Sequence, residues 1–217
     1  MIELIVKALA AYLIGSVVGS LLIGRLRGVD IRTMGSGNAG ATNMLRTQGK
    51  AAALAVFLID LGKGTVATGV LAPLAVAGIP PAGPALQALV IPACGLAVIA
   101  GHVYPLWYGL RGGKGVATFL GAVLGINAGL MLVMVLTWLT VVILCGFVGL
   151  ASMAGAVAVT AAIAARYSGA HPELLVFGVL AALLIMYTHR GNIGRMLAGT
   201  EPRARRLWLF GLRRGPG

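Results

Sequence analysis

Apolar segments recur along nearly the whole chain, and most of them approach the length of a membrane-spanning helix, about 20 residues. Charged, proline-rich or glycine-rich stretches separate these segments. The run 116–147 is too long for one crossing, so we divide it at a glycine-flanked turn near residue 127. The expected spans are residues 2–24, 51–77, 85–103, 116–125, 129–147, 149–165 and 173–188. The pattern predicts an all-α, polytopic integral membrane protein with seven transmembrane helices.

Composition excludes the soluble and the disordered classes. Apolar residues make up 59% of the 217 residues and charged residues 10%, whereas a soluble domain carries about 25% charged residues and disorder requires low hydrophobicity. We expect a single membrane-embedded domain over residues 1–217, with a basic tail at 189–217. The first apolar segment precedes Arg25 and Arg27, so we interpret it as a retained span rather than a cleaved signal.

The distribution of basic residues predicts the orientation. With the N-terminus outside, fourteen of the seventeen lysines and arginines fall in loop 25–50, loop 104–115 and the C-terminal tail, which then face the cytoplasm. Cytoplasmic loops carry such an excess, so we predict an outside N-terminus and a cytoplasmic C-terminus. Because the basic residues flank apolar spans, we expect anionic lipids and phosphorylated substrates as partners, and no nucleic acid.

The first cytoplasmic loop contains a small polar cluster that suits an anion. It reads GSGNAGATN over residues 35–43, but no strand precedes its glycines, so a dinucleotide site is not indicated. Glycine backbones can turn N–H groups towards an anion, and Ser, Asn and Thr add neutral donors. An ordinary turn is the alternative interpretation. The candidate residues are Gly35, Ser36, Gly37, Asn38, Gly40, Thr42, Asn43 and Arg46.

The second loop reads GHVYPLWYGLRGGKGVAT over residues 101–118. It differs from a Walker A loop because Tyr108 replaces the first glycine and Gly115 follows the lysine. A lysine among glycines at the start of a helix still suits a phosphate, although a positive-inside lysine at a span boundary is an equal alternative. The candidate residues are His102, Gly112, Gly113, Lys114 and Gly115.

A third cluster follows the last span, where His189 and Asn192 stand three residues apart and GTE occupies 199–201. The two side chains share a face if the helix continues, although a lone interfacial histidine is more often structural. Within the second span we interpret Asp60 and Lys63 as a structural ion pair, with substrate contact as the alternative. Under the predicted topology all three clusters face the cytoplasm, so we expect one basic pocket for phosphate groups.

The residue pattern also limits the chemistry. No acid stands near a Ser–His pair as a triad would require, and no histidine is followed by aspartate five residues later. The sequence shows no cluster of metal ligands, so we expect neither a metal nor a cofactor. Any reaction at this site must use positioning and positive charge.

The three clusters resemble the bacterial acyl-phosphate:glycerol-3-phosphate acyltransferase family, which shows GSGNxGATN, GHxxPxxxxxxGGKGVAT and HRxNIxR…GTE in this order. The resemblance covers essentially the whole chain. It implies transfer of a fatty acyl group from acyl phosphate to the 1-hydroxyl of glycerol 3-phosphate, giving lysophosphatidic acid and phosphate. Neither acyl-CoA nor acyl carrier protein would be the direct donor. It also implies a multi-pass protein of the bacterial inner membrane whose active site faces the cytoplasm.

By matching position, the resemblance assigns the catalytic and phosphate-holding roles to Ser36, Arg46, Lys114, His189 and Asn192. The loop glycines would fit against substrate oxygens. Before the sixth span the family has a hydroxyl-rich run, of which only Ser152 keeps a hydroxyl here, as a candidate substrate contact.

We expect Lys114 to neutralise the leaving phosphate, and Arg46, Ser36 and His189 to hold glycerol 3-phosphate. The hydroxyl proton would pass to a substrate phosphate or to His189. We also expect a monomer. The alternatives are an organic-phosphate transporter, which should carry more ionisable residues within its spans than this chain does, and a non-catalytic lipid-binding subunit.

Overall fold

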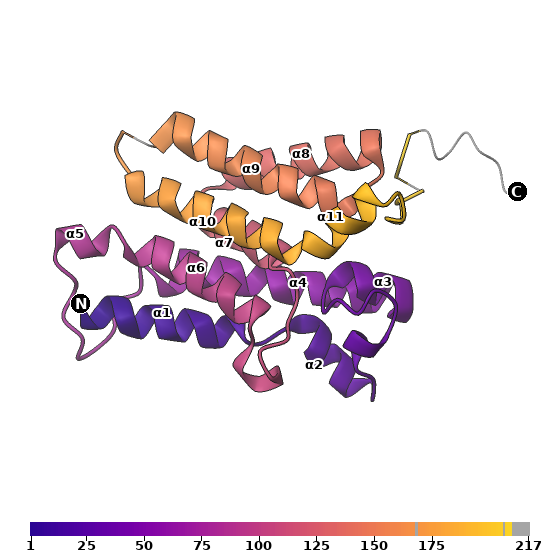
Figure 1. Ribbon diagram of the computed structural model, residues 1–217. Helices are drawn as coiled ribbons and strands as arrows, with labels where there is room; N and C mark the ends of the chain where they lie inside the picture. The colour runs from indigo at the N-terminus through magenta and orange to yellow at the C-terminus, as the bar shows by residue number, and fades with distance from the viewer. Residues whose placement is uncertain (168, 206, 210–217) are drawn as a thin grey trace, which may run out of the picture. The chain divides into compact units, whose positions relative to one another are not determined.

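The structure, a computed structural model, describes residues 1–167, 169–205 and 207–209, and every regular element in these ranges is a helix (Figure 1). The prediction of an all-α fold is confirmed for this part of the chain. The chain divides into two compact units, the first Met1–Ala128 and the second from Gly129 onward.

The first unit packs its helices in two close pairs, α1 with α6 and α4 with α7. A side chain on Gly15 would overlap the backbone of Val98, and one on Gly121 would overlap the backbone of Leu61. Such glycines let helix backbones approach closely, as is common between helices in membranes. The elements of this unit are α1 (Ile2–Gly15), α2 (Gly19–Leu26), η1 (Ile31–Thr33), α3 (Ala41–Gln48), α4 (Lys50–Val66), η2 (Ala67–Leu71), α5 (Pro84–Gln87), α6 (Val90–Val103), η3 (Leu106–Tyr108) and α7 (Val116–Ile126).

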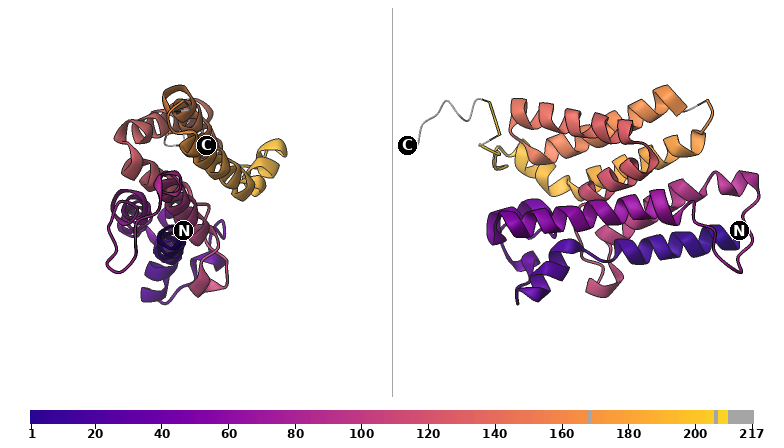
Figure 2. Two further views of the ribbon diagram at one scale, coloured as in Figure 1. Left: turned by 90° about the vertical axis from the view of Figure 1, so that its left-hand side faces the viewer. Right: turned by 180° about the vertical axis from the view of Figure 1, so that it is seen from behind.

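The first apolar segment, predicted over 2–24, is interrupted. The helix axes of α1 and α2 differ by 43°, and the link between them is visible from the front and from behind (Figures 1 and 2). The amide of Gly19, whose regular helical acceptor would be the carbonyl of Gly15, instead donates to Asp60 Oδ1 at 3.1 Å. The sequence pattern did not reveal this break because its side-chain partners lie on α4.

The second apolar segment is helical over a shorter range than the predicted 51–77. α4 continues as the π-helix η2, which ends at Leu71. Pro73 follows, and proline lacks the amide hydrogen that a continuing helix needs. The prediction that this segment extends to residue 77 is therefore corrected: residues beyond 73 belong to the connection that leads to α5.

The second unit consists of α8 (Ala128–Cys145), α9 (Val148–Tyr167), α10 (Pro172–Thr188) and α11 (Arg190–Leu197). α9 and α10 pack along their lengths. The stretch predicted as a basic tail begins with a helix, because α11 continues the chain after a 55° bend. Further on, the amides of Ala204 and Leu209 donate to the carbonyls of Gly146 and Ile143 at 2.8 and 2.9 Å. The tail thereby satisfies carbonyl groups at the C-terminal end of α8, which its own helix leaves without donors.

Several helical segments have the length and apolarity of a membrane span. Four helical segments are long and apolar enough by themselves to cross a membrane: Lys50–Leu71, Pro84–Tyr108, Ala128–Cys145 and Val148–Tyr167. The bent pairs α1–α2 and α10–α11 each pass when counted as one span, and α7 is a shorter apolar helix. All of these segments overlap the seven predicted ones, whereas the number of crossings and the orientation stay predictions.

Candidate functional site

The first loop is folded around the side chain of Asn43. Its Nδ2 donates to the carbonyls of Ile31 and Met34 at 3.1 and 2.9 Å, and its Oδ1 accepts from the amide of Ser36 at 2.9 Å. Asn43 is buried, and Gly35 packs so closely against it that a Cβ would overlap Oδ1. The amide of Asn43, predicted to bind substrate, thus serves as a brace that shapes the loop.

The brace leaves other candidates of this loop at the surface. Ser36, Thr42 and Arg46 are exposed. Asn38 lies over Gly40, the residue that precedes the first turn of α3. Gly37 has a φ of +70°, in the left-handed region that glycine adopts most readily. The loop therefore presents a hydroxyl and a guanidinium at its surface, next to the N-terminal turn of α3.

The second loop folds back on the end of α6. The amides of Gly112 and Gly113 donate to the carbonyls of Val103 and His102 at 3.0 and 3.1 Å. A Cβ on Gly112 would overlap the carbonyl of His102, and one on Gly113 would overlap both His102 Nε2 and the carbonyl of Ala39. These two predicted substrate-contacting glycines are therefore required for close packing against His102 and the first loop.

Lys114 lies immediately after this close contact and is half-buried. Gly115 follows with a φ of +83° and precedes the first turn of α7. Lys114 thus stands one residue before the N-cap of α7, at a helix start whose N–H groups and dipole favour an anion. Within the first unit, the structure brings the first and second predicted clusters together. His189 and Asn192 belong to the second unit.

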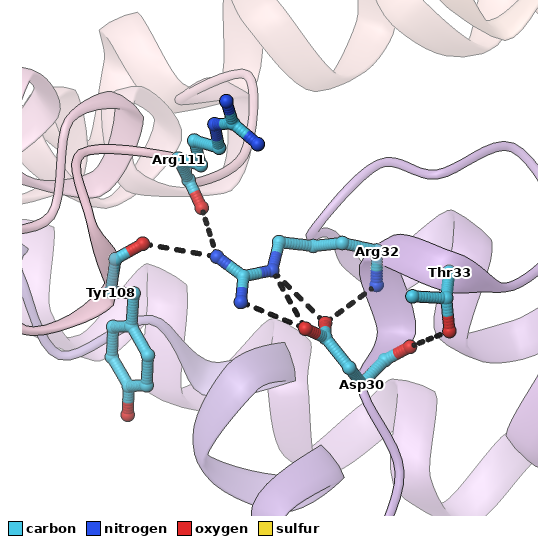
Figure 3. Close-up of polar contacts among 5 residues, drawn as sticks. All are labelled: Asp30, Arg32, Thr33, Tyr108 and Arg111. Carbon is cyan, nitrogen blue, oxygen red and sulfur yellow. Dashed lines mark hydrogen bonds and ion pairs between the residues drawn. The ribbon is translucent and has the colours of Figure 1, made fainter.

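An exposed ion pair joins these two loops, as Figure 3 shows. The guanidinium of Arg32 donates to both carboxylate oxygens of Asp30, with the shortest contact, Nη2 to Oδ2, at 2.8 Å. Its Nη1 also donates to the carbonyls of Tyr108 and Arg111 at 3.0 and 3.3 Å. We call these four residues the Arg32 clasp.

The electrostatics of the Arg32 clasp follow from these contacts. The hydrogen bond from the Arg32 side chain holds the pKa of Asp30 below its usual range, and the bond from the Arg32 amide adds to this effect. The carboxylate in turn raises the pKa of Arg32. The sequence did not reveal Arg32 as a site residue, because its partners in the second loop are backbone carbonyls.

The predicted ion pair of the second span lies beneath the second loop. Lys63 Nζ is 3.0 Å from Asp60 Oδ1, and both side chains are almost fully buried. The same ammonium lies 2.8 Å from Nδ1 of His102, which is buried as well. The three side chains form a compact buried cluster that we call the Asp60–Lys63–His102 cluster.

In the second unit, His189 stands where α10 ends. Its Nδ1 lies 2.8 Å from the carbonyl of Ile185. Because a carbonyl can only accept, Nδ1 carries a hydrogen, and a neutral ring then has its lone pair on Nε2. The contact with Ile185 therefore fixes the tautomer of a neutral His189 ring, with its hydrogen on Nδ1 and its lone pair on Nε2.

Glu201 fixes the other members of the third cluster. Its Oε1 accepts from Asn192 Nδ2 and its Oε2 from Arg195 Nε, each at 2.6 Å. Asn192 also packs over Gly149, whose Cβ would lie 3.1 Å from its side chain. Glu201 was missed as a site residue, although its place in the GTE stretch was a signal that could have found it.

Ser152, the candidate contact on α9, is buried, and its hydroxyl donates to the carbonyl of Val148 at 2.9 Å. A serine hydroxyl has one hydrogen, so this bond leaves Ser152 only its acceptor lone pairs for any other group. A negatively charged phosphate needs donors, which makes Ser152 a weaker candidate than Ser36 for that contact.

The candidate groups of the first unit are suited to binding an anion. They include a guanidinium, an ammonium, a hydroxyl and free helix N–H groups around two touching loops. Among the described residues, no group of three His, Cys, Asp or Glu side chains is placed to hold a metal ion. The chemistry that this arrangement supports is stabilisation and positioning of phosphate groups.

Comparison with known proteins identifies relatives over nearly the whole chain. A family model described as glycerol-3-phosphate acyltransferase matches residues 5–199. The glycerol-3-phosphate acyltransferase of Synechococcus sp. (strain CC9902) is 40% identical over 193 residues, covering 88% of this chain and 90% of that protein. The one of Mesorhizobium japonicum is 39% identical over 199 residues, covering 91% and 94%.

Two solved structures are also similar. Both are crystal structures of PlsY (YgiH), an integral membrane glycerol 3-phosphate acyltransferase. The glycerol 3-phosphate form is 33% identical with a TM-score of 0.81, and the match covers 92% of this chain and 94% of that one. The lysophosphatidic acid form is 32% identical with a TM-score of 0.78, over the same shares of both chains.

Proposed function

This chain belongs to the glycerol-3-phosphate acyltransferase family, and we propose that it transfers a fatty acyl group from acyl phosphate to the 1-hydroxyl of glycerol 3-phosphate. The products are lysophosphatidic acid and inorganic phosphate. The observation that carries the proposal is the match to the glycerol 3-phosphate form of PlsY over 92% of the chain. The chain is an all-α integral membrane protein, and a lipid-embedded site suits an acyl donor and a lysophospholipid product.

The residues of the first unit support a phosphate-binding role. Lys114 lies beside the N-terminus of α7, and the exposed Ser36 and Arg46 lie on the touching first loop. In our proposal Lys114 and nearby backbone N–H groups stabilise the charge that develops on the leaving phosphate. Ser36 and Arg46 hold the phosphate of glycerol 3-phosphate, which places its hydroxyl against the acyl carbonyl.

In the proposed reaction, the 1-hydroxyl oxygen bonds to the acyl carbon while the bond from that carbon to the phosphate oxygen breaks. The electron pair leaves with inorganic phosphate. The hydroxyl proton passes to a substrate phosphate, whose second pKa is about 6, or to Nε2 of His189. The contact of Nδ1 with Ile185 supports the second route, because it leaves the lone pair of a neutral ring on Nε2.

We propose seven membrane crossings with the N-terminus outside and the C-terminus in the cytoplasm of a bacterium, in its inner membrane. We also propose that residues 1–217 form a single membrane-embedded catalytic domain. A monomer is sufficient for this scheme. Reporter fusions at both termini test the orientation, and light scattering of the purified protein tests the monomer.

The activity is tested with purified protein, acyl phosphate and radiolabelled glycerol 3-phosphate. We expect labelled lysophosphatidic acid with acyl phosphate as donor and none with acyl-CoA or acyl-loaded carrier protein. A parallel experiment follows uptake of labelled glycerol 3-phosphate into vesicles that lack any donor. Uptake without formation of lysophosphatidic acid would contradict the enzyme and favour transport.

The role of Lys114 is tested by Lys114→Ala. Loss of the ammonium that stabilises the leaving phosphate should lower kcat by about 100- to 1,000-fold, the range seen when one oxyanion-stabilising group is removed. Lys50→Ala is the matched control, because Lys50 is an exposed lysine at the start of α4. Both variants should keep the helical circular dichroism spectrum. Near-normal turnover of Lys114→Ala would refute the leaving-phosphate role.

A further inference from the structure

The Asp60–Lys63–His102 cluster also hydrogen-bonds to the backbone at the break between α1 and α2. At the break between α1 and α2, the carbonyls of Gly15 and Val17 accept from Lys63 Nζ, both at 2.9 Å. The amide of Gly19 donates to Asp60 Oδ1 at 3.1 Å. The ammonium and the carboxylate therefore take over the backbone groups that the interrupted helix leaves without regular partners.

The same ammonium orients the imidazole of His102. Lys63 Nζ is only a donor, and it lies 2.8 Å from Nδ1. A contact of that length between two nitrogens requires Nδ1 to accept, so the hydrogen of the neutral ring is on Nε2. In the alternative tautomer, Nδ1–H would donate to Asp60 Oδ1 over 3.3 Å. The hydrogen on Nδ1 would then face the ammonium hydrogens of Lys63, so that two donors would lie 2.8 Å apart without an acceptor between them.

The Nε2 edge of His102 is directed at the glycine loop. A Cβ on Gly113 would overlap Nε2 and also the carbonyl of Ala39, so the ring edge lies against the contact between the first and second loops. Lys114 is the next residue along the chain. Nε2–H is thus a neutral donor next to the place where the loop carries its positive charge.

We propose that Asp60 and Lys63 are positioning residues that hold His102 in the Nε2–H tautomer, so that His102 donates this hydrogen to a substrate phosphate at the glycine loop. The inference rests on the proposed acyl transfer, because that reaction supplies the phosphate. Either the phosphate of acyl phosphate or that of glycerol 3-phosphate provides the same acceptor oxygens. A neutral donor held in place by a buried pair strengthens binding without adding charge to the loop.

The first test is the tautomer of His102 in the unaltered protein, measured by NMR after selective 15N labelling of histidine. The chain has three histidines, and the variants His171→Gln and His189→Gln assign the signals. We expect the Nε2–H form for His102. In Lys63→Met, Asp60 is the remaining partner, so the ring should change to the Nδ1–H form. An Nδ1–H ring in the unaltered protein would overturn the proposal, whatever Lys63→Met does.

The second test compares His102→Gln with His102→Asn. The amide nitrogen of glutamine can replace Nε2–H, whereas that of asparagine replaces Nδ1. We expect His102→Asn to raise one substrate's KM by about 10- to 100-fold, the loss of one hydrogen bond to a charged group. His102→Gln should retain most of the affinity, and kcat should change less than KM in both. Measuring KM for acyl phosphate and for glycerol 3-phosphate separately identifies the phosphate.

The two proposals fail in different ways. If the unaltered protein forms no lysophosphatidic acid, the proposed function is wrong, while the NMR measurement still judges the tautomer. If the protein is active but His102→Gln and His102→Asn raise KM equally, His102 fills space and donates nothing to a substrate. If Lys63→Met is folded and active but keeps the Nε2–H ring, Lys63 does not set the tautomer.

Discussion

Two ion pairs hold the second loop of the first unit, and they differ mainly in burial. The side chains of Lys63 and Asp60 are 5% and 2% exposed, whereas those of Arg32 and Asp30 are 31% and 42% exposed. The buried pair reaches the loop through the ring of His102, and the exposed pair reaches it through two backbone carbonyls. One loop is therefore held from its buried side and from its surface.

The difference in burial shows that an ion pair can either fix a buried group in place or connect two loops at the surface. A buried charge is tolerated only when it is paired and hydrogen-bonded, and Lys63 Nζ has four polar atoms within 3.0 Å. These contacts fix the position of the Lys63 ammonium. A partly exposed pair contributes only about 0–1 kcal/mol to stability. The Arg32 clasp is therefore important because its guanidinium reaches two backbone carbonyls of the second loop, and not because its ion pair is strong.

The largest effect is expected when the buried pair is broken. Lys63→Met leaves the carboxylate of Asp60 buried without its cation and removes a donor from two carbonyls. We expect the free energy of unfolding to fall by about 3–5 kcal/mol. Thermal unfolding in detergent, followed by circular dichroism, measures the change, and Lys50→Met on the exposed start of α4 is the control. A loss of less than 1 kcal/mol would show that the two pairs do not differ as their burial implies.

Removing both charges sharpens the comparison. A buried pair that only balances its own charges can often be replaced by apolar residues without loss. Here Asp60→Leu combined with Lys63→Met would still leave the amide of Gly19 and the carbonyls of Gly15 and Val17 without these partners. We expect the double variant to stay about 1–3 kcal/mol less stable than the unaltered protein. Full recovery of stability would mean that the backbone of the break does not depend on the pair.

The sequence predicted the helices well and their interruptions poorly. Apolar length is a local property, so the segments that form α6, α8, α9 and α10 could be located within a few residues. The break after Gly15 contains no proline and depends on two side chains of α4, which the local pattern does not contain. α3 was expected as loop because its eight residues are polar on average, and the buried contacts of Asn43 are tertiary.

Site residues were predictable as chemical types but not as partners. The glycines around Lys114 and the donors around Ser36 indicated an anion site from residue identity alone. Arg32 could not be assigned in this way, because its acceptors stand 76 and 79 residues further along the chain and every residue carries a carbonyl. The bracing contacts of Asn43 could not be predicted for the same reason, because an amide that braces a loop and one that binds a ligand look identical in sequence.

The Arg32 clasp should affect activity more than stability. Arg32→Ala removes the donor that joins the loops, but the exposed pair contributes only about 0–1 kcal/mol to folding. We expect a change in unfolding free energy below 1 kcal/mol and a rise in substrate KM of about 5- to 10-fold, the loss of roughly one net hydrogen bond. Arg32→Lys keeps the charge without the planar fork and should also raise KM. A KM for Arg32→Lys equal to that of the unaltered protein would show that charge alone is sufficient.

The smallest effect is the pH dependence of the Arg32 clasp. The hydrogen bond from Arg32 lowers the pKa of Asp30 in the folded protein, whereas an unfolded aspartate has a pKa of about 3.9. The carboxylate therefore adds stability above that value and loses it as the pH falls through the lower folded pKa. The stability difference between the unaltered protein and Asp30→Asn should be constant near neutral pH and should shrink under acidic conditions.

Because Asp30 is 42% exposed, we expect the difference to stay below about 1 kcal/mol. The control is the same substitution in an Arg32→Ala background, where the acid-dependent part should become smaller, because only the hydrogen bond from the backbone amide of residue 32 then remains. A stability difference that grows on acidification would exclude the ion pair as its cause.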